Sequence, residues 1–262
     1  MPESPGSPGG RRAEPGPDGR LRCPWALGSA EYLDYHDDEW GRPVRDDQGI
    51  FERLCLEAFQ SGLSWLTILR KRENFRAAFC GFDMAAVSAF GPADVARLLG
   101  DAGIVRNRAK IEAAIRNAGA AQALPGGLTA LVWRYADASP GPDHEASAGT
   151  APVSTAPVST APVSTAPVST GPVSTGPVST GPVSTGPVST GPVSEAPVSE
   201  APVSTADIPS WTPASKDLSR ELRLRGFSFT GPVTAYATMQ ACGIVDDHLL
   251  SCFRRGAYSG SG

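Results

Sequence analysis

Apolar residues recur along most of the chain with the spacing of amphipathic helices, whereas the alternation typical of strands is nearly absent. Residues 48–58 carry a clear i, i+3/i+4 stripe, made of Ile50, Phe51, Leu54, Cys55 and Ala58. Comparable patterns predict helices over residues 66–79, 83–90, 92–99, 128–136, 215–226, 231–245 and 246–253. Residues 100–124 are predicted to form a glycine-centred turn and then a long helix. We expect Ser215 to be an N-cap and Gly226 to end that helix. The sequence therefore predicts an all-α fold.

One long segment breaks this pattern. Residues 151–205 are eleven copies of a five-residue unit, APVST or GPVST, in which Glu sometimes takes the last place. A period of five fits neither helix nor strand, and one valine per unit is too little to offset ~1–2 kcal/mol of ordering entropy per residue. We expect a disordered insert over residues 139–205. It divides one domain into residues 21–138 and 206–256, with disordered tails at 1–20 and 257–262.

The N-terminal sequence and the net charge indicate where the protein is located and which partners it can bind. The first residues contain arginines but no apolar h-region, and no apolar run approaches the ~18 residues of a membrane helix. We therefore expect a cytoplasmic protein with no membrane partner, which disfavours a secreted stalk whose repeats carry O-linked sugars. The formal net charge of −4 becomes about −1 without the tail and the insert, so any nucleic acid would have to be bound by local basic patches.

Four residues near the two ends of the domain have the chemistry of a metal site. Twelve residues separate Cys23 from His36, and three separate His248 from Cys252, so the second pair would share one face of a helix. Two thiolates and two imidazoles suit tetrahedral zinc, and four protein ligands would make that zinc structural. Two unrelated, buried Cys–His neighbours fit the same spacing. Consecutive carboxylates at 37–39 converge poorly on one ion, which disfavours a hard-metal site there.

A possible DNA-binding hairpin lies at residues 101–115. A glycine between two helices, followed by Arg106, Arg108 and Lys110, suits a helix-hairpin-helix, in which backbone N–H groups at a helix N-terminus bind phosphate. A solvated helix face with three basic residues would look the same. A second basic cluster, residues 70–76, favours DNA contact.

Aromatic residues form a third group, with Trp25, Tyr35, Trp40 and Trp65 near Glu57 along the chain. Large aromatic side chains usually belong to a core. Glu57 projects away from the apolar stripe of its helix, so it is either an exposed carboxylate or the wall of a cleft, and helical geometry does not choose between them.

Taken together and in order, five stretches and one cysteine closely resemble the bacterial 3-methyladenine DNA glycosylase I family. They are CPW, YHDDEWGRPVRDD, FERLCLEAFQSGLSWLTILRKRENFRAAF, DAGIVRNRAKIEAAIRNA, RGFSFTGPVTAYATMQACGIVDDH and the final Cys252. The resemblance covers nearly all of residues 21–255 apart from the insert. It implies an all-α helix-hairpin-helix fold with one structural zinc ion per chain, bound by Cys23, His36, His248 and Cys252.

The resemblance also implies an enzyme that flips a damaged base out of the duplex. Trp65 matches the ring that stacks on the base, and Tyr35 and Glu57 match the groups that hydrogen-bond to it. Trp25 and Trp40 match further pocket walls, while Leu63 is a candidate for the plug that fills the gap in the duplex. The residues expected to contact DNA in the hairpin are Gly103, Val105, Arg106, Arg108 and Lys110.

The implied activity is base excision: hydrolysis of the N-glycosidic bond of 3-methyladenine by a monofunctional glycosylase, here expected to act as a monomer on double-stranded DNA with alkylated bases. A non-catalytic binder of alkylated or distorted DNA is the alternative, and a zinc-dependent hydrolase is third. Other helix-hairpin-helix glycosylases carry an aspartate beyond the hairpin. None is evident after residue 115 here, so Glu57 is expected to act by recognition and electrostatics. Asp246 departs from the family, which usually has asparagine there.

Overall fold

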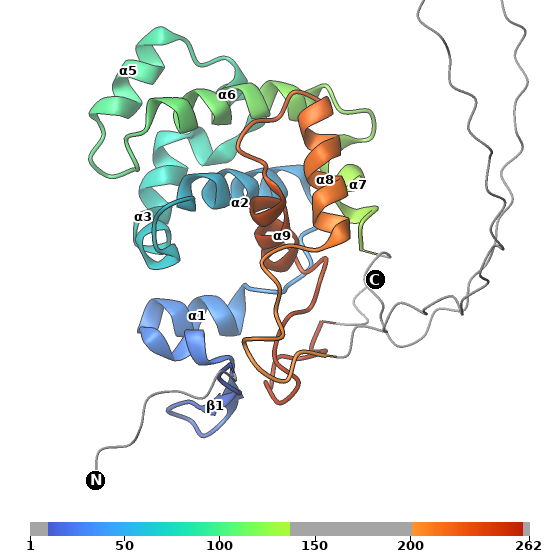
Figure 1. Cartoon of the computed structure of the whole chain (residues 1–262). Helices are drawn as coiled ribbons and strands as arrows, with labels where there is room; N and C mark the ends of the chain where they lie inside the picture. The colour runs from blue at the N-terminus through green and yellow to red at the C-terminus, as the bar shows by residue number, and fades with distance from the viewer. Residues whose placement is uncertain (1–9, 137–200, 259–262) are drawn as a thin grey trace, which may run out of the picture. The chain divides into compact units, whose positions relative to one another are not determined.

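The computed structural model describes residues 10–136 and 201–258, which Figure 1 draws in colour. Within these residues the fold is mostly helical, as predicted, and the sheet found there pairs two short antiparallel strands, β1 (Glu14–Pro15) and β2 (Leu21–Arg22). Most of the predicted disordered insert and the outer parts of both predicted tails lie outside the described residues. Among the helices of the described ranges, none has the length and apolar character needed to cross a bilayer.

Helix α2 (Asp47–Gln60) lies at the centre of the fold, because it packs against α3, α6, α7 and α9. Every residue from 54 to 59 on this helix is buried. The other helices before the insert are η1 (Pro24–Gly28), α1 (Ala30–Asp38), α3 (Trp65–Ala78), η2 (Cys80–Phe82), α4 (Met84–Ser88), α5 (Pro92–Gly100), α6 (Arg108–Gln122) and α7 (Gly127–Trp133). Those after it are α8 (Pro213–Leu224) and α9 (Pro232–Ala241).

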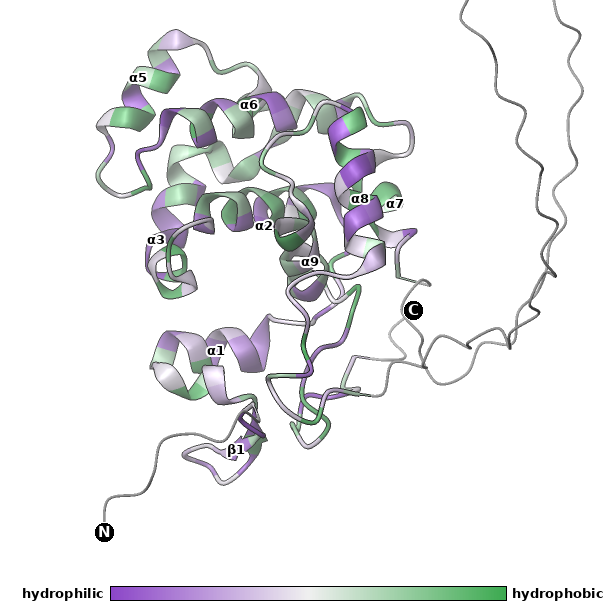
Figure 2. Cartoon of the chain, in the orientation of Figure 1, coloured by the Kyte–Doolittle hydropathy of each residue, from purple (hydrophilic) through white to green (hydrophobic). Residues whose placement is uncertain are grey.

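The core contains a cluster of fully buried phenylalanine rings from α2, α3 and the segment that follows α3. They are Phe51, Phe59, Phe75, Phe79 and Phe82. The outer helices cover this core with their apolar faces. On α8, Leu218 and Leu222 are buried, and the hydrophobic and hydrophilic residues of this helix alternate along its length in Figure 2. The periodic pattern of the sequence thus corresponds to burial around α2.

Three predictions about helix positions were wrong in detail. The predicted helices omit α1, which begins after the N-cap Ser29. Residues 246–253 form turns instead of the predicted helix. In α8 the N-cap is Thr212, and Ser215 is the N3 residue of a capping box that it forms with Thr212. The proline at the first helical position fixes φ for a helix start, and this signal identifies the earlier cap.

The folded structure also extends beyond the predicted boundaries. Residues 10–20, assigned to a tail, include β1, and residues 201–205, assigned to the insert, hydrogen-bond to distant segments. The Thr205 amide donates to the Arg11 carbonyl, and the Leu250 amide donates to the Pro202 carbonyl. Such backbone pairs between distant segments leave no periodic signal in the sequence. In Figure 1 the segments before α1, before α8 and after α9 lie beside one another.

A buried amide connects α6 to the loop between α8 and α9, and its loss should destabilise the fold. Asn117 is 1% exposed. Its Nδ2 donates to the Ser228 carbonyl (3.0 Å), and its Oδ1 accepts from the Ser228 amide (2.8 Å). We expect Asn117→Ala to lower the free energy of unfolding by about 2–4 kcal/mol, because both backbone groups lose a partner. Urea unfolding should show Asn74→Ala, at an exposed site, within about 0.5 kcal/mol of the wild type; equal losses would contradict this role.

Candidate functional site

A cleft of about 590 Å³ lies among α1, α2, α3 and α9. Its wall contains the five residues that the sequence analysis assigned to recognition of the base, which are Trp25, Tyr35, Trp40, Glu57 and Trp65. They come from different elements: η1, α1, the turn after α1, the end of α2 and the start of α3. The cleft therefore forms only when these elements pack together.

The aromatic rings of the wall contact one another in edge-to-face and tilted arrangements. Trp25 lies against Trp40 with ring centroids 5.1 Å apart and an interplanar angle of 84°. Tyr35 lies 5.4 Å from Trp65, with the rings tilted by 51°. The indole N–H of Trp65 is buried and has no hydrogen-bond partner among the described residues. The cleft thus has a wall of closely packed aromatic side chains.

Glu57 adds a carboxyl group to this apolar surface. The residue is 7% exposed, and burial raises the pKa of its carboxyl group to about 8. Burial is the sole cause, because no described hydrogen-bond or charge partner lowers that pKa. Burial also raises the pKa of the Tyr35 hydroxyl, and the Glu57 carboxylate raises it further, so this phenol stays protonated. A cationic ligand in the cleft would favour the ionised form of Glu57 and be attracted by it.

Further residues that the sequence did not single out complete the cleft wall. They are Tyr32, Gln60, Thr205, Ile208, Ala237 and Gln240. Two of them had a signal in the sequence, since Tyr32 and Gln60 lie one helical turn from Tyr35 and Glu57, respectively. Of the other four, Thr205 is the last residue of the predicted insert, and the remaining three follow it in the sequence. Their proximity depends on the packing of α9 and on the hydrogen bonds that hold residues 201–208.

The four predicted metal-site residues converge in a second, buried cluster. The donor atoms of Cys23, His36, His248 and Cys252 all lie within 4.8 Å of one another. Cys252 Sγ lies 3.4 Å from His36 Nε2 and 3.7 Å from His248 Nδ1, and the same Nδ1 lies 3.9 Å from Cys23 Sγ. Donor atoms around a tetrahedral zinc ion are roughly 3.3–3.8 Å apart, given its usual bond lengths. The cluster could therefore hold a metal ion, and its donor set fits zinc.

The orientation of both histidines also fits a metal site. His36 Nδ1 lies 2.8 Å from the Asp37 carboxylate, and His248 Nε2 lies 3.2 Å from the Trp40 carbonyl. Both partners are acceptors, so these nitrogens carry the protons and the opposite nitrogens face the sulfur atoms with their lone pairs. The sequence analysis did not assign this role to Asp37, although its place directly after His36 could have marked it as the partner of that ring.

The other acidic residues of this stretch serve separate contacts. The Glu39 carboxylate forms two hydrogen bonds with the Arg72 guanidinium, at 2.6 and 2.7 Å. Asp38 is exposed and lies 3.6 Å from Arg254. A shared hard-metal site, which the sequence disfavoured, therefore does not form from these three acids. The carboxylate of Asp246 accepts from the His248 amide at 3.1 Å and from the Gly256 amide at 2.8 Å, so it fixes the turn that carries His248.

Helices α5 and α6 are joined by the turn at residues 101–107. The Gly103 amide donates to the Asp101 carboxylate at 2.7 Å, and the Gly103 carbonyl accepts from Lys71 at 3.3 Å. Val105 is half-buried. Arg106 is exposed and forms no ion pair within the described ranges, and Arg108 is exposed with Glu112 3.4 Å away. This turn offers two exposed cations.

Lys110 corrects the expectation of a third surface cation. It is 8% exposed, and its Nζ donates to the Phe59 carbonyl (2.9 Å) and the Ser61 carbonyl (2.6 Å). It therefore caps the end of α2, which also fixes the turn containing Leu63. That side chain is 40% exposed and lies next to Gln60 of the cleft wall, whose Nε2 donates to the Leu63 carbonyl. A count of charges along a helix cannot reveal acceptors on another element.

The basic cluster at residues 70–76 is likewise used inside the fold. Arg72 pairs with Glu39, Arg76 pairs with Glu52, and Lys71 donates to the Ala102 carbonyl at 2.8 Å. These contacts connect α3 to its neighbours. The cluster does not form a free basic surface, contrary to the support for DNA contact that the sequence suggested.

Comparisons with known proteins show which family this chain resembles in sequence and in fold. The sequence matches the methyladenine glycosylase family model over residues 25–179 and 189–255. It is 35% identical to DNA-3-methyladenine glycosylase 1 of Escherichia coli (strain K12), over 88% of this chain and 95% of that protein. A crystal structure of 3-methyladenine DNA glycosylase I shares 34% identity, with a TM-score of 0.65, over 89% of this chain and 99% of that one. A variant of such an enzyme, in complex with 3-methyladenine, shares 26% identity, with a TM-score of 0.62, over 89% and 97%.

The raised pKa of Glu57 predicts a pH-dependent cost to stability. Between pH 4.5 and about 8 the folded protein keeps a proton that the unfolded chain releases, so the free energy of unfolding falls as the pH rises. Glu57→Gln should remove this decline and stabilise the protein by up to about 3 kcal/mol at pH 7, with little effect below pH 4.5. Urea unfolding across this range would measure it. A gain that does not change with pH, or the same gain in Glu73→Gln at an exposed site, would contradict it.

Proposed function

Because the chain belongs to the methyladenine glycosylase family, we propose that it hydrolyses the N-glycosidic bond of 3-methyladenine in DNA and leaves an abasic site in base-excision repair. The observation that carries this proposal is the partnerless, buried carboxyl group of Glu57 in a cleft walled by aromatic rings. The proposed substrate is duplex DNA that contains alkylated bases, and we propose that the protein acts on it as a monomer.

The chemistry of the damaged base suits this cleft. Methylation at N3 gives adenine a positive charge, which a carboxylate and aromatic faces prefer over the neutral base. Binding of the cation lowers the pKa of Glu57, so the group ionises and the charges attract. The charged base is already a good leaving group. The bond from the base to C1′ breaks with its electrons going to the base, which leaves as neutral 3-methyladenine. Water supplies the hydroxyl group that bonds to C1′, and its remaining proton is released to the solvent.

The cleft residues take separate roles in this proposal. A base inside the cleft has left the duplex stack, because a duplex cannot present the base edge to a buried carboxylate. Trp65 stacks on the base, and Tyr35 and Glu57 hydrogen-bond to its edge. Trp25 and Trp40 form the remaining walls. Leu63, exposed on the turn beside Gln60, fills the gap that the flipped nucleotide leaves.

The turn between α5 and α6 is the proposed helix-hairpin-helix contact with DNA. Backbone N–H groups near Gly103 and Val105 face a phosphate, and Arg106 and Arg108 supply the nearby positive charge. Lys110 supports this contact from within, since its ammonium group joins α6 to the end of α2. Hairpin and cleft are thereby held in a fixed relation.

The Cys/His cluster is the proposed zinc site. The ion would be held by Cys23, His36, His248 and Cys252, and four protein ligands leave no position for a substrate. Zinc would supply bonds that fix the ends of the domain to each other. Trp25 and Trp40 both touch the histidine rings, so these bonds also stabilise the cleft wall.

Base release from methylated DNA tests the proposed activity. We expect the wild-type protein to release free 3-methyladenine, measured by chromatography. Glu57→Ala should lower the rate roughly 10- to 100-fold, because it removes a charge-assisted contact with the base. Glu73→Ala, at an exposed site on α3, should leave the rate unchanged. Tight binding to methylated duplex without any release would instead identify a non-catalytic binder.

The salt dependence of DNA binding tests the hairpin. Arg106→Gln should weaken binding to duplexes of any sequence and reduce the slope of log affinity against log salt by about one, because one phosphate contact is lost. Arg220→Gln removes an exposed cation on α8 and is the matched control. Equal slopes for Arg106→Gln and the wild type would show that DNA does not contact this turn.

A further inference from the structure

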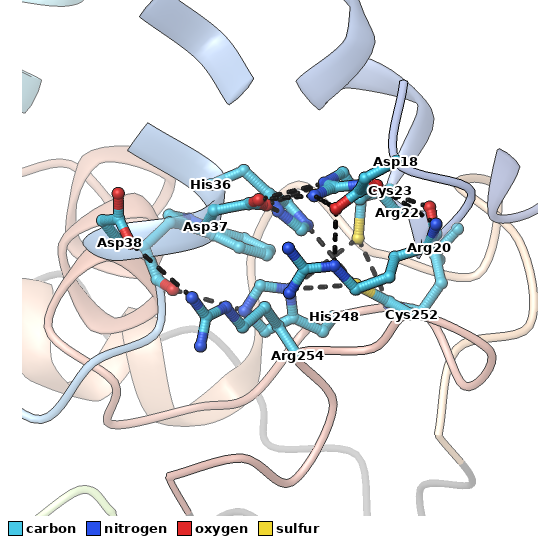
Figure 3. A network of polar contacts seen from close by, with 12 residues as sticks. Asp18, Arg20, Arg22, Cys23, His36, Asp37, Asp38, His248, Cys252 and Arg254 are labelled. Atoms are coloured by element: carbon cyan, nitrogen blue, oxygen red, sulfur yellow. Dashed lines mark hydrogen bonds and ion pairs between the residues drawn. The ribbon is translucent and has the colours of Figure 1, made fainter. Parts of the chain in front are cut away.

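Arg22 lies buried beside the Cys/His cluster and uses all of its hydrogen-bond donors (Figure 3). Its side chain is 3% exposed. Nε and Nη2 donate to the Asp37 carboxylate, at 3.0 and 2.7 Å. Nη1 and Nη2 donate to the Asp18 carboxylate, at 2.5 and 2.9 Å, and Nη1 also donates to the Arg20 carbonyl at 3.2 Å. A guanidinium has five N–H donors, and these contacts use every one of them.

This guanidinium is connected to three parts of the cluster. Arg22 directly precedes the ligand Cys23 in the chain. Through Asp37 it reaches His36, whose Nδ1 lies 2.8 Å from the same carboxylate. It also lies against the ring of Phe253, with 4.8 Å from the guanidinium carbon to the ring centroid, and Phe253 follows the ligand Cys252.

Asp18 belongs to the N-terminal hairpin, in the turn between β1 and β2. The hairpin is closed by backbone hydrogen bonds between Gly16 and Arg20 and between Gly19 and Gly16, each 2.9 Å long. It precedes residue 25, where the match to the family model begins. Asp18 therefore lies outside the part of the chain that the family model matches.

We propose that Arg22, fixed by Asp18, is a positioning residue for the His36 ligand, so that the N-terminal hairpin raises the affinity of the cluster for zinc. The inference rests on the zinc site of the proposed function. An Asp37 carboxylate held at two points keeps the His36 ring in one orientation, with its Nε2 lone pair toward the ion. Partners of metal-bound histidines commonly change metal affinity 10- to 100-fold when lost.

The relay requires the geometry of arginine. A lysine ammonium has three donors at one point and cannot hold two carboxylates in fixed planes. Asp18 acts only through Arg22, because its carboxylate accepts from the guanidinium and from Arg20 but from no ligand of the cluster. Loss of Asp18 leaves the buried guanidinium with the Asp37 carboxylate and the Arg20 carbonyl as its acceptors.

Competition with a chromophoric chelator measures zinc affinity in the full-length protein. Arg22→Gln should weaken zinc binding about 10- to 100-fold, and Asp18→Asn, at a half-exposed turn that tolerates the change, about 3- to 10-fold. Arg22→Lys should weaken zinc binding as much as Arg22→Gln does. Asp18→Glu, in contrast, should keep most of the wild-type zinc affinity. Cobalt(II) should bind with an altered visible spectrum in Asp18→Asn, since the orientation of one imidazole changes.

Two controls separate this relay from general electrostatics. Arg20→Gln removes a hairpin cation that also pairs with Asp18 but does not reach Asp37. Asp38→Asn removes an exposed carboxylate at the position next to Asp37. Both should bind zinc within about twofold of the wild type, because neither side chain holds a partner of a metal-binding histidine.

A double variant decides the order of the relay. Asp18→Asn should have no further effect once Arg22→Gln is present. Wild-type zinc affinity and an unchanged cobalt spectrum in Asp18→Asn would overturn the proposal, as would an equal loss from Asp18→Asn with and without Arg22. A wild-type protein that binds no zinc would overturn both this inference and the proposed zinc site, whereas base release without zinc would leave the proposed activity standing.

Discussion

Four buried side chains from opposite ends of the sequence meet at one point, and the rest of the molecule depends on that meeting. Cys23, His36, His248 and Cys252 lie in segments with little regular structure of their own: a short 3-10 helix, the end of α1 and the turns after α9. Periodic apolar faces pack α2 to α9 against one another, but the segments at the two ends have few such faces. These segments are instead brought together at the buried Cys/His cluster, which could hold a metal ion.

The same meeting point forms one side of the cleft. The Trp25 ring lies 5.2 Å from the His36 ring, and Trp40 lies 4.6 Å from His248. On the opposite side Glu57 projects from α2, and within the described part of the chain its carboxyl group has no hydrogen-bond or charge partner. The fold thus tolerates an unfavourable group at the place where a cationic base would compensate for it. Stability in the absence of substrate and affinity for a charged base are opposed at this residue.

Much of this structure was readable from the sequence, where the signal was local or carried by a family motif. The helices with apolar stripes were predicted to within a few residues, and the Cys/His and aromatic residues do converge. The failures concern contacts between distant segments. Lys110 looked like a surface cation because its carbonyl acceptors lie on another helix. The tail and the last repeat looked disordered because the hydrogen bonds that order them come from residues far away in sequence.

The last repeat unit, residues 201–205, is part of the folded structure: Pro202 accepts from Leu250, and Thr205 lines the cleft. Each of the preceding units also has proline at its second position, and most end in threonine. Tandem repeats gain and lose whole units by replication slippage. If the last unit were lost, the preceding unit, which also contains Pro-Val-Ser, would take its place next to the folded structure. The number of repeat units can therefore change while residues of nearly the same types remain at the junction between the insert and the folded structure.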